Sequence, residues 1–307
     1  MSSPPTLCVI VPIYNEASGL AGLLAELQTS LEPLELEYQC LIVDDGSTDA
    51  TWATLTELKD TYPLKGLRLS RNFGKEAALC AGLEFAEGDV FVTMDGDLQH
   101  PPGLIPEMLE AWRERGCDLV EAVKMRSPNE GFFSRTRARL FYKVFNLLCG
   151  TDLEGQTDFK LLSARARDAW LRLPERNMFF RGVTNWLGFE RARVQFRVPD
   201  IPGRDSRWSF FGLMRYAINN ITAFSSIPLT MLLVTGLLLL FPASLVGGWT
   251  LYLKFTGQAV NGLSTINFLI LSSGGLNFLG LSILGLYVGR IHEEVKSRPR
   301  YVLREQL

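Results

Sequence analysis

Two carboxylates, Asp95 and Asp97, stand one residue apart directly after the apolar run Val90–Met94. Such a run predicts a buried parallel strand, and ligands bind at the carboxyl ends of the strands in an open α/β sheet. Two oxygen ligands this close together suit a hard divalent cation, Mg²⁺ or Mn²⁺, which completes its shell with water and substrate phosphates. Because Asp and Gly are also common turn residues, the same segment is compatible with a plain solvated turn.

Two further predicted strands end in side chains that could bind a nucleotide. Asp44 and Asp45 follow the run Tyr38–Val43, and each could accept a hydrogen bond from an N–H of a base. A strand, a turn and a helix cap would account for residues 46–49 but not for the two acids before them. The first apolar run supplies an aromatic face, an amide and a carboxylate able to accept from ribose hydroxyls; the residues are Pro12, Tyr14, Asn15 and Glu16.

Apolar runs and helical patterns alternate through the first part of the chain. This alternation predicts an α/β domain with a mostly parallel sheet, right-handed crossovers and helices on both faces. No GxGxxG motif follows any predicted strand, which disfavours a dinucleotide-binding site and a P-loop. The predicted strands are Leu7–Ile13, Tyr38–Val43, Gly66–Leu69, Val90–Met94 and Asp118–Val123, and the predicted helices are Ala17–Ser30, Asp49–Thr61, Lys75–Ala86 and Pro102–Arg115.

The last third of the chain is much more apolar. Tyr216–Leu253 and Phe255–Gly289 contain no Asp, Glu, Lys or Arg, and each exceeds the ~20 residues that cross a bilayer as a helix. We therefore expect two transmembrane helices, roughly Pro228–Tyr252 and Ser264–Val288. Basic residues are concentrated after the second run, so the positive-inside rule places both termini and the α/β domain in the cytoplasm.

Other bulk features narrow the class of protein. The formal net charge of −2 over 307 residues gives no reason to expect a nucleic-acid partner. The five cysteines are scattered without CxxC spacing, as expected of buried thiols in a reducing compartment. The N-terminus does not have the pattern of a secretory signal.

A basic amphipathic pattern covers residues 131–150. Apolar side chains share one helical face and basic ones, Arg135 and Arg139 among them, lie opposite, as in helices that lie on an anionic membrane surface. Arg137 falls among the apolar residues, where it could bind a lipid phosphate. A helix packed on the sheet with a solvated basic face would show the same pattern. We expect a second, aromatic-rich interfacial segment at residues 206–226.

The motifs taken together resemble the family 2 glycosyltransferases, inverting enzymes of GT-A (Rossmann-like) fold. VPIYNE, VDDGSTD and DGDLQ occur in that order at successive predicted strand ends. The full set is similar to the polyprenyl-phosphate branch, which contains dolichyl-phosphate mannose synthase and bacterial undecaprenyl-phosphate sugar transferases. The resemblance extends through RNFGKEAAL (71–79), TDFKLLS (157–163), RNMFFRG (176–182), RDSRWS (204–209) and GLYVGRIHEEVKSRPRY (285–301).

The resemblance implies a role for each matched residue. Asp45, with Asp44 beside it, would hold the base, and Asp95 and Asp97 would bind the Mg²⁺ or Mn²⁺ that bridges the diphosphate. Relatives often have Ser-Lys-Tyr where this chain has residues 206–208, which leaves its phosphate contact open. The base and ribose would be surrounded by Pro12, Tyr14 and Glu16, and the donor pocket would also include Lys75 and Gln99. The phosphates would be covered by Arg204 and Arg207, and the lipid phosphate would be bound by Arg135, Arg137 and Arg139. The catalytic residues would be Asp97, Asp158 and Arg207.

The expected activity is transfer of one sugar from a nucleoside diphosphate sugar, first UDP-glucose, to a polyprenyl phosphate, first undecaprenyl phosphate, at the cytoplasmic leaflet of the bacterial inner membrane. GDP-mannose, UDP-galactose and amino-arabinose donors also fit. A phosphate monoester is largely ionised at neutral pH, so Asp158 could position the substrates and need not remove a proton. A processive polysaccharide synthase would need more membrane helices and a QxxRW motif, and the intact acids disfavour an inactive membrane scaffold. A homo-oligomer is left open.

The expected domain plan follows from these features. It consists of a GT-A domain at 1–205, a juxtamembrane segment at 206–226, a two-helix transmembrane hairpin at 227–290 and a basic cytoplasmic tail at 291–307.

Overall fold

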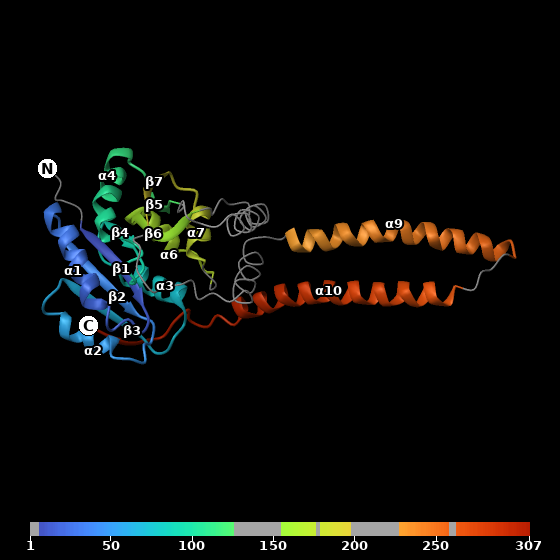
Figure 1. Cartoon of the computed structure of the whole chain (residues 1–307), viewed down its shortest axis with the longest axis horizontal. Helices are drawn as coiled ribbons and strands as arrows, with labels where there is room; N and C mark the ends of the chain where they lie inside the picture. Colours follow the sequence, from blue (N-terminus) through green and yellow to red (C-terminus); the bar gives the residue numbers. More distant parts are fainter. Residues whose placement is uncertain (1–5, 126–154, 176–178, 198–226, 258–261) are drawn as a thin grey trace. The chain divides into compact units, whose positions relative to one another are not determined.

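The computed structural model describes residues 6–125, 155–175, 179–197, 227–257 and 262–307 (Figure 1). The chain divides into two compact units. The first holds the α/β part of the chain together with the last residues, Arg298–Leu307, and the second holds two long helices. The predicted interfacial segments at 131–150 and 206–226 lie outside the described residues.

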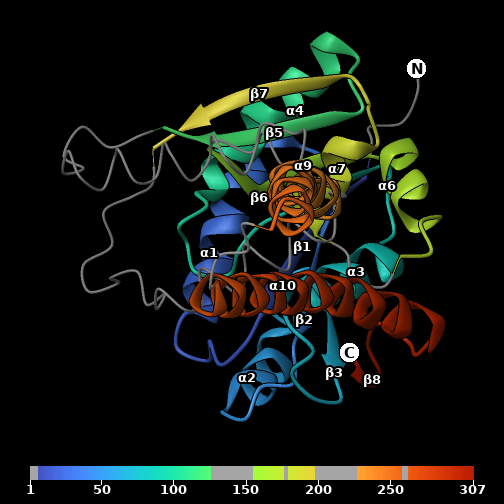
Figure 2. The same ribbon diagram turned by 90° about the vertical axis from the view of Figure 1, so that its right-hand side faces the viewer.

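The first unit is built on a mixed sheet with the strand order β7-β5-β6-β4-β1-β2-β3-β8. Figure 2 shows β7 at one edge of this sheet and β8 at the other. β1 pairs in parallel with β2 and β4, β2 with β3, and β5 with β7, whereas β6 and β8 run antiparallel to their neighbours. The strands are β1 (Leu7–Ile13), β2 (Tyr38–Asp44), β3 (Leu64–Leu69), β4 (Val90–Thr93), β5 (Leu119–Lys124), β6 (Gln156–Ser163), β7 (Arg191–Phe196) and β8 (Leu303–Gln306).

Helices cover both faces of the sheet, which explains why β1 is apolar along its whole length and why every residue of β4 is buried. On one face, Val9 and Val11 of β1 join a core with the leucines of α1. On the other face, α3 approaches β1 so closely that a Cβ added at Gly82 would lie 2.2 Å from Ile10 Cγ2. The helices of this unit are α1 (Leu20–Leu31), α2 (Thr51–Leu58), α3 (Lys75–Phe85), α4 (Ile105–Arg115), α6 (Ala164–Leu171) and α7 (Phe180–Trp186), with 3₁₀ turns at Glu32–Leu34 and Pro102–Leu104.

The mostly parallel α/β architecture is confirmed. Each predicted strand and helix up to Val123 is present, with ends that shift by up to three residues, and Pro102–Leu104 forms a 3₁₀ turn before α4. β6 was not predicted, because its polar residues Thr157, Asp158 and Lys160 interrupt the apolar pattern.

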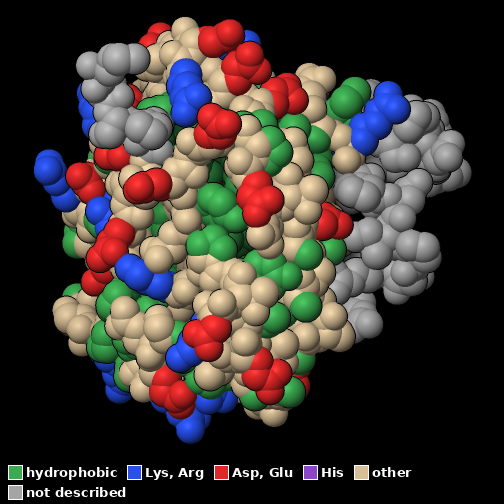
Figure 3. Space-filling view, turned by 90° about the vertical axis from the view of Figure 1, so that its left-hand side faces the viewer, with side chains coloured by type: hydrophobic (Ala, Val, Ile, Leu, Met, Phe, Trp, Pro, Cys, Tyr) green, Lys and Arg blue, Asp and Glu red, His purple; other side chains and the backbone are tan. Residues whose placement is uncertain are grey.

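On the face drawn in Figure 3, Lys and Arg side chains are interspersed with Asp and Glu, so the described residues there present both signs of charge.

The predicted basic tail 291–307 contains a strand that the sequence does not indicate. Leu303–Gln306 forms β8, which pairs antiparallel with the edge strand β3. Leu307 continues the pairing through a hydrogen bond from its N–H to Gly66 O at 2.8 Å. Four residues with the sequence LREQ carry no strand-like apolar pattern. Their conformation follows from the open hydrogen-bonding edge that β3 offers.

The second unit contains α9 (Ile227–Phe255) and α10 (Leu263–Val295), which run in opposite directions (Figure 1). They include the predicted spans Pro228–Tyr252 and Ser264–Val288. Among the described residues, one segment, Ser272–Val295, is long and apolar enough to cross a membrane, with a mean hydropathy of 1.3. That both helices span a bilayer, and in which orientation, stays a prediction.

The close approach of α3 to β1 predicts a sharp size limit at Gly82. Gly82→Ala should place a methyl group against Ile10 and destabilise the protein by about 1–3 kcal/mol, as overpacked cores do. Gly22→Ala is the matched control, because Gly22 lies in α1 with open space around its Cβ position. Thermal unfolding of the detergent-solubilised protein should show a lower midpoint for Gly82→Ala only. An unchanged midpoint would contradict this packing.

Candidate active site

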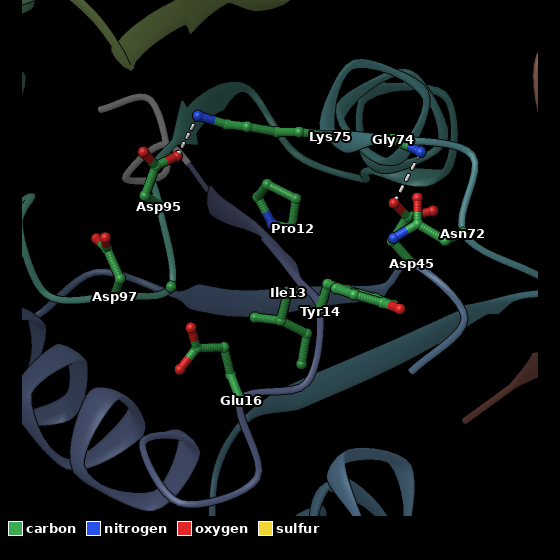
Figure 4. A pocket seen from close by; sticks show the side chains of 11 residues that line it. Pro12, Ile13, Tyr14, Glu16, Asp45, Asn72, Gly74, Lys75, Asp95 and Asp97 are labelled. Carbon is green, nitrogen blue, oxygen red and sulfur yellow. Dashed lines mark hydrogen bonds and ion pairs between the residues drawn. The ribbon is translucent and has the colours of Figure 1, made fainter. Parts of the chain in front are cut away.

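The candidate site is a cavity of about 320 Å³ at the carboxyl ends of β1, β2 and β4 (Figure 4). Carboxyl ends of parallel strands meet at one edge of a sheet, so acids from separate motifs are brought together there. Of the residues predicted from the sequence, seven line this cavity: Pro12, Tyr14, Glu16, Asp45, Lys75, Asp95 and Asp97. Ile13, Asn72, Gly74 and Gly96 complete the lining.

The loop after β4 holds Asp95 and Asp97 at the same cavity. Gly96 lies against the end of β1, where a Cβ would lie 2.7 Å from Ile13 Cγ2, so a larger residue would push the loop away. Asp97 Oδ1 accepts a hydrogen bond from Gln99 N at 3.1 Å. Gln99 itself does not line the cavity. The loop is thus a turn, and its conformation directs two carboxylates into the cavity.

His100 stabilises the loop that carries Asp95 and Asp97. Its Nδ1 accepts a hydrogen bond from Asp95 N at 2.9 Å, and its ring stacks on Phe159 with centroids 5.2 Å apart. Burial lowers the pKa of His100, so the imidazole is neutral at neutral pH and Nδ1 can act as an acceptor. In the sequence, His100 suggests only a cap before the prolines that follow. Its position three residues after Asp97 was the available signal for a role in the loop.

Lys75 is the cation of the site. It is the first residue of α3, and its Nζ lies 2.6 Å from Asp95 Oδ1 (Figure 4). The same Nζ also contacts Asp158. Although burial works against the charged form, the two carboxylates raise the pKa of Lys75 above its usual value. Lys75 therefore stays an ammonium ion at neutral pH.

Asp158 lies behind Lys75 on β6 and is 3% exposed. Arg181 of α7 donates from Nε to Asp158 Oδ1 at 2.7 Å and from Nη2 to Oδ2 at 2.9 Å. Burial opposes ionisation, but Lys75 and Arg181 hold the pKa of Asp158 below its usual range. The carboxylate is ionised and doubly paired. Arg181 was given no role from the sequence, although it belongs to the RNMFFRG motif.

Glu76 connects α3 to α7 next to this pair. Its Oε2 accepts a hydrogen bond from Phe180 N, the first residue of α7, at 2.9 Å. Burial, together with the nearby charge of Asp158, raises the pKa of Glu76 to about 7. No local pattern in the sequence indicates this shift in pKa, because it is caused by burial and by the charge of Asp158, which is more than 80 residues away.

The two acids after β2 lie in different environments. Asp45 lines the cavity, and its Oδ1 and Oδ2 accept hydrogen bonds from Phe73 N and Gly74 N, each at 2.8 Å. Asp44 is fully buried, does not line the cavity, and accepts from Ser47 N at 2.8 Å. That either acid binds a base stays a prediction. The predicted phosphate-binding arginines Arg135, Arg137, Arg139, Arg204 and Arg207 lie outside the described residues.

The donor set at the cavity fits a hard cation held jointly by protein and substrate. Among the described residues, no group of three or more His, Cys, Asp or Glu side chains is arranged to hold a metal ion. Mg²⁺ and Mn²⁺ are commonly bound by one or two carboxylates and the phosphates of a substrate, and Asp95 and Asp97 supply that number. Lys75 occupies one oxygen of Asp95, so a cation at this place would share Asp95 with the ammonium ion or displace it.

The raised pKa of Glu76 predicts a pH-dependent stability. A carboxyl with a higher pKa in the folded state binds its proton more tightly there, so stability falls as pH rises from about 4.5 to about 7. Glu76→Gln should remove this loss, which is on the order of 2 kcal/mol. Unfolding free energies from urea titrations between pH 4.5 and 8 measure it. Glu57→Gln on α2 is the control and should follow the wild type; parallel curves for wild type and Glu76→Gln would refute the prediction.

Comparison with known proteins identifies a family and several relatives that this chain resembles. Residues 8–175 match the model of the family described as Glycosyl transferase family 2. A protein of Synechocystis sp. named "Uncharacterized glycosyltransferase sll0501" is 35% identical over 304 residues, 97% of this chain and 94% of that protein. The SfII prophage-derived bactoprenol glucosyl transferase of Shigella flexneri is 33% identical over 303 residues, 97% of either chain.

Among solved structures, the mannosyl-3-phosphoglycerate synthase from Rubrobacter xylanophilus has a TM-score of 0.51 at 19% identity, over 71% of this chain and 72% of its own. This likeness shows a shared GT-A-like fold. The family resemblance that the motifs indicate is thereby confirmed, and the chain belongs to glycosyl transferase family 2.

Proposed function

We propose that this protein transfers a single glucosyl residue from UDP-glucose to undecaprenyl phosphate, with inversion at the anomeric carbon. The observation that carries the proposal is the cavity in which Asp45, Lys75, Asp95 and Asp97 meet at the strand ends of a family 2 domain. Support for the lipid acceptor comes from relatives named bactoprenol glucosyl transferase, which align over nearly the whole of both chains.

The cavity offers a place for each part of the donor. Tyr14 is 43% exposed, points toward Asp45 (Figure 4), and provides a ring face for the base. Asp95, Asp97 and Lys75 lie further along the same cavity, where the diphosphate would be bound. A divalent cation held by Asp95 and Asp97 would neutralise charge on the leaving diphosphate when bound.

The reaction makes one bond and breaks one. An oxygen of the acceptor phosphate attacks the anomeric carbon from the face opposite the leaving group, and the electron pair of the broken carbon–oxygen bond departs with UDP. Lys75, kept cationic by its two carboxylates, is placed to offset the negative charge that develops on UDP.

Asp158 acts in this scheme as a positioning group. An acceptor phosphate has its second pKa near 6, so it is largely ionised at neutral pH and needs no strong base. Asp158 is itself engaged by Lys75 and by both donors of Arg181, which suits it to holding Lys75 in place. We place the reaction at the cytoplasmic leaflet because Arg290, Lys296, Arg298, Arg300 and Arg304 follow the apolar stretch of α10.

The proposed diphosphate site predicts a specific loss of activity. Asp97→Ala should reduce transfer of radiolabelled glucose from UDP-glucose to chloroform-soluble lipid by about 100-fold or more, because charge on the leaving group is no longer neutralised. Asp60→Ala, in the turn after α2, is the matched control and should retain transfer. Undiminished transfer by folded Asp97→Ala would exclude the proposed role.

The same assay separates donors. Membranes that contain the protein are incubated with labelled UDP-glucose, UDP-galactose or GDP-mannose in separate reactions. Only the reaction with UDP-glucose should give a labelled lipid, and that lipid should carry a single sugar. A polymeric product would point to a processive synthase, and labelling from GDP-mannose alone would replace the proposed donor.

A further inference from the structure

β8 runs beside the strand that leads into one end of the cavity lining. β8 pairs with β3 so that Glu305 lies opposite Arg68 and Gln306 opposite Leu67. The pairing continues past the end of β3, where Ser70 N donates to Val302 O at 2.8 Å. Ser70 comes directly before the segment that contributes Asn72, Gly74 and Lys75 to the cavity.

Arg68 connects this strand to the loop after β2. Its guanidinium is 3.3 Å from Glu305 Oε1, 3.4 Å from Ser47 O and 3.5 Å from Asp44 Oδ2. It also lies over the ring of Trp52, 5.7 Å from the centroid. One side chain thus contacts the C-terminal strand, a buried carboxylate and the backbone of the loop.

The carboxylate of Asp44 needs this partner. Its side chain is 0% exposed, and a buried charge is costly unless it is paired and hydrogen-bonded. Ser47 N satisfies Oδ1, while Oδ2 faces Arg68. Arg68 is therefore the charged partner of the buried Asp44, through an ion pair at 3.5 Å and not through a hydrogen bond.

This loop in turn shapes the cavity. Ser47 Oγ accepts a hydrogen bond from Asn15 N at 2.9 Å, and Thr48 N donates to Asn15 Oδ1 at 2.9 Å. Asn15 has a left-handed backbone with φ of 54°, and it stands between Tyr14 and Glu16, which both line the cavity. Asn adopts the left-handed conformation more readily than most residues with a side chain, and these two bonds stabilise it here.

The segment before β8 also contacts α3. The Tyr301 hydroxyl donates to Glu84 Oε2 at 2.7 Å, near the end of the helix that begins with Lys75. The C-terminal residues therefore contact both β3 and α3, the two elements that flank the cavity segment 70–75.

We propose that β8 and Arg68 position the nucleoside-binding end of the donor cavity. Glu305 orients the Arg68 guanidinium, Arg68 holds Asp44 and Ser47, and these hold Asn15 and Asp45 so that Tyr14, Glu16 and Asp45 face a nucleoside. Arg68 is a positioning residue, since it does not line the cavity. The inference rests on the proposed function, because it assigns this end of the cavity to the nucleoside of UDP-glucose.

The test compares nucleotide binding with turnover in the full-length protein in detergent. Arg68→Met should weaken UDP binding, measured by isothermal titration calorimetry, and raise the KM for UDP-glucose, each by about 10-fold, with kcat changed less than about 3-fold. Such a split between KM and kcat is expected of a residue that shapes ground-state binding. Arg68→Lys should recover part of the affinity, because an ammonium ion can pair with Asp44 but cannot span all three partners.

Two variants address the C-terminal strand itself. Glu305→Gln should weaken UDP binding by only about 2-fold, as expected for a partly exposed ion pair, and Glu305→Lys by more, because it repels Arg68. Lys65→Met is the control: Lys65 lies on the same strand as Arg68 but pairs with the exposed Glu87. It should leave UDP binding unchanged.

The outcomes separate the two proposals. If the wild type binds UDP and folded Arg68→Met binds it equally well, the positioning role is overturned and the donor assignment stands. If the wild type binds no UDP, the donor assignment fails, and the inference fails with it. Should Arg68→Met not fold, the double variant Asp44→Asn/Arg68→Met removes the buried charge and still lacks the contacts to Ser47 and Glu305. It should also bind UDP about 10-fold more weakly, and wild-type affinity in it would overturn the inference.

Discussion

The charge pairing at Asp158 is the constraint on which the cavity depends. A carboxylate that is 3% exposed requires compensation, and Lys75 and Arg181 provide it from α3 and α7. This single group therefore joins a central strand to two helices. Through Lys75 it also fixes the distance between α3 and the loop that carries Asp95. Removing either cation would leave the buried Asp158 carboxylate with only one of its two charged partners, so full compensation requires β6, α3 and α7 to assemble together.

The direction of β6 explains how Asp158 reaches the site. In a fully parallel sheet the edge that binds ligands receives side chains only from the carboxyl ends of strands. β6 runs antiparallel to β4, with Thr93 opposite Lys160, so the beginning of β6 meets the end of β4. The Thr93 hydroxyl donates to Asp158 O at 2.6 Å and fastens the two strands at this point. The beginning of β6 thus adds Asp158 to a sheet edge that is otherwise formed by the carboxyl ends of strands.

Much of the site was predictable from local sequence patterns. The remainder was not predictable, because it depends on contacts between residues that are distant in the sequence. Apolar runs ending in acids are visible within a few residues, so Asp45, Asp95 and Asp97 were placed correctly at one edge. β6 was missed because Asp158 and Lys160 look like surface residues until their partners from other elements are known. His100, Glu76 and Arg181 act through neighbours that are distant in sequence or through the shape of a loop. Asp44 resembles Asp45 in the sequence, and only the arrangement of Arg68 and Ser47 shows that it is buried.

The pairing of β8 with β3 bears on how the protein is made. Domains begin to fold during synthesis, with the N-terminal part first. β3 is then an uncovered edge strand, able to pair with other chains, until residues 303–306 have been added. Those residues come after α9 and α10, so both apolar helices are synthesised before the sheet can be completed. A nascent chain that stops within α10 would therefore carry β3 as an open sheet edge beside two apolar helices, and would expose two surfaces at once through which chains can associate.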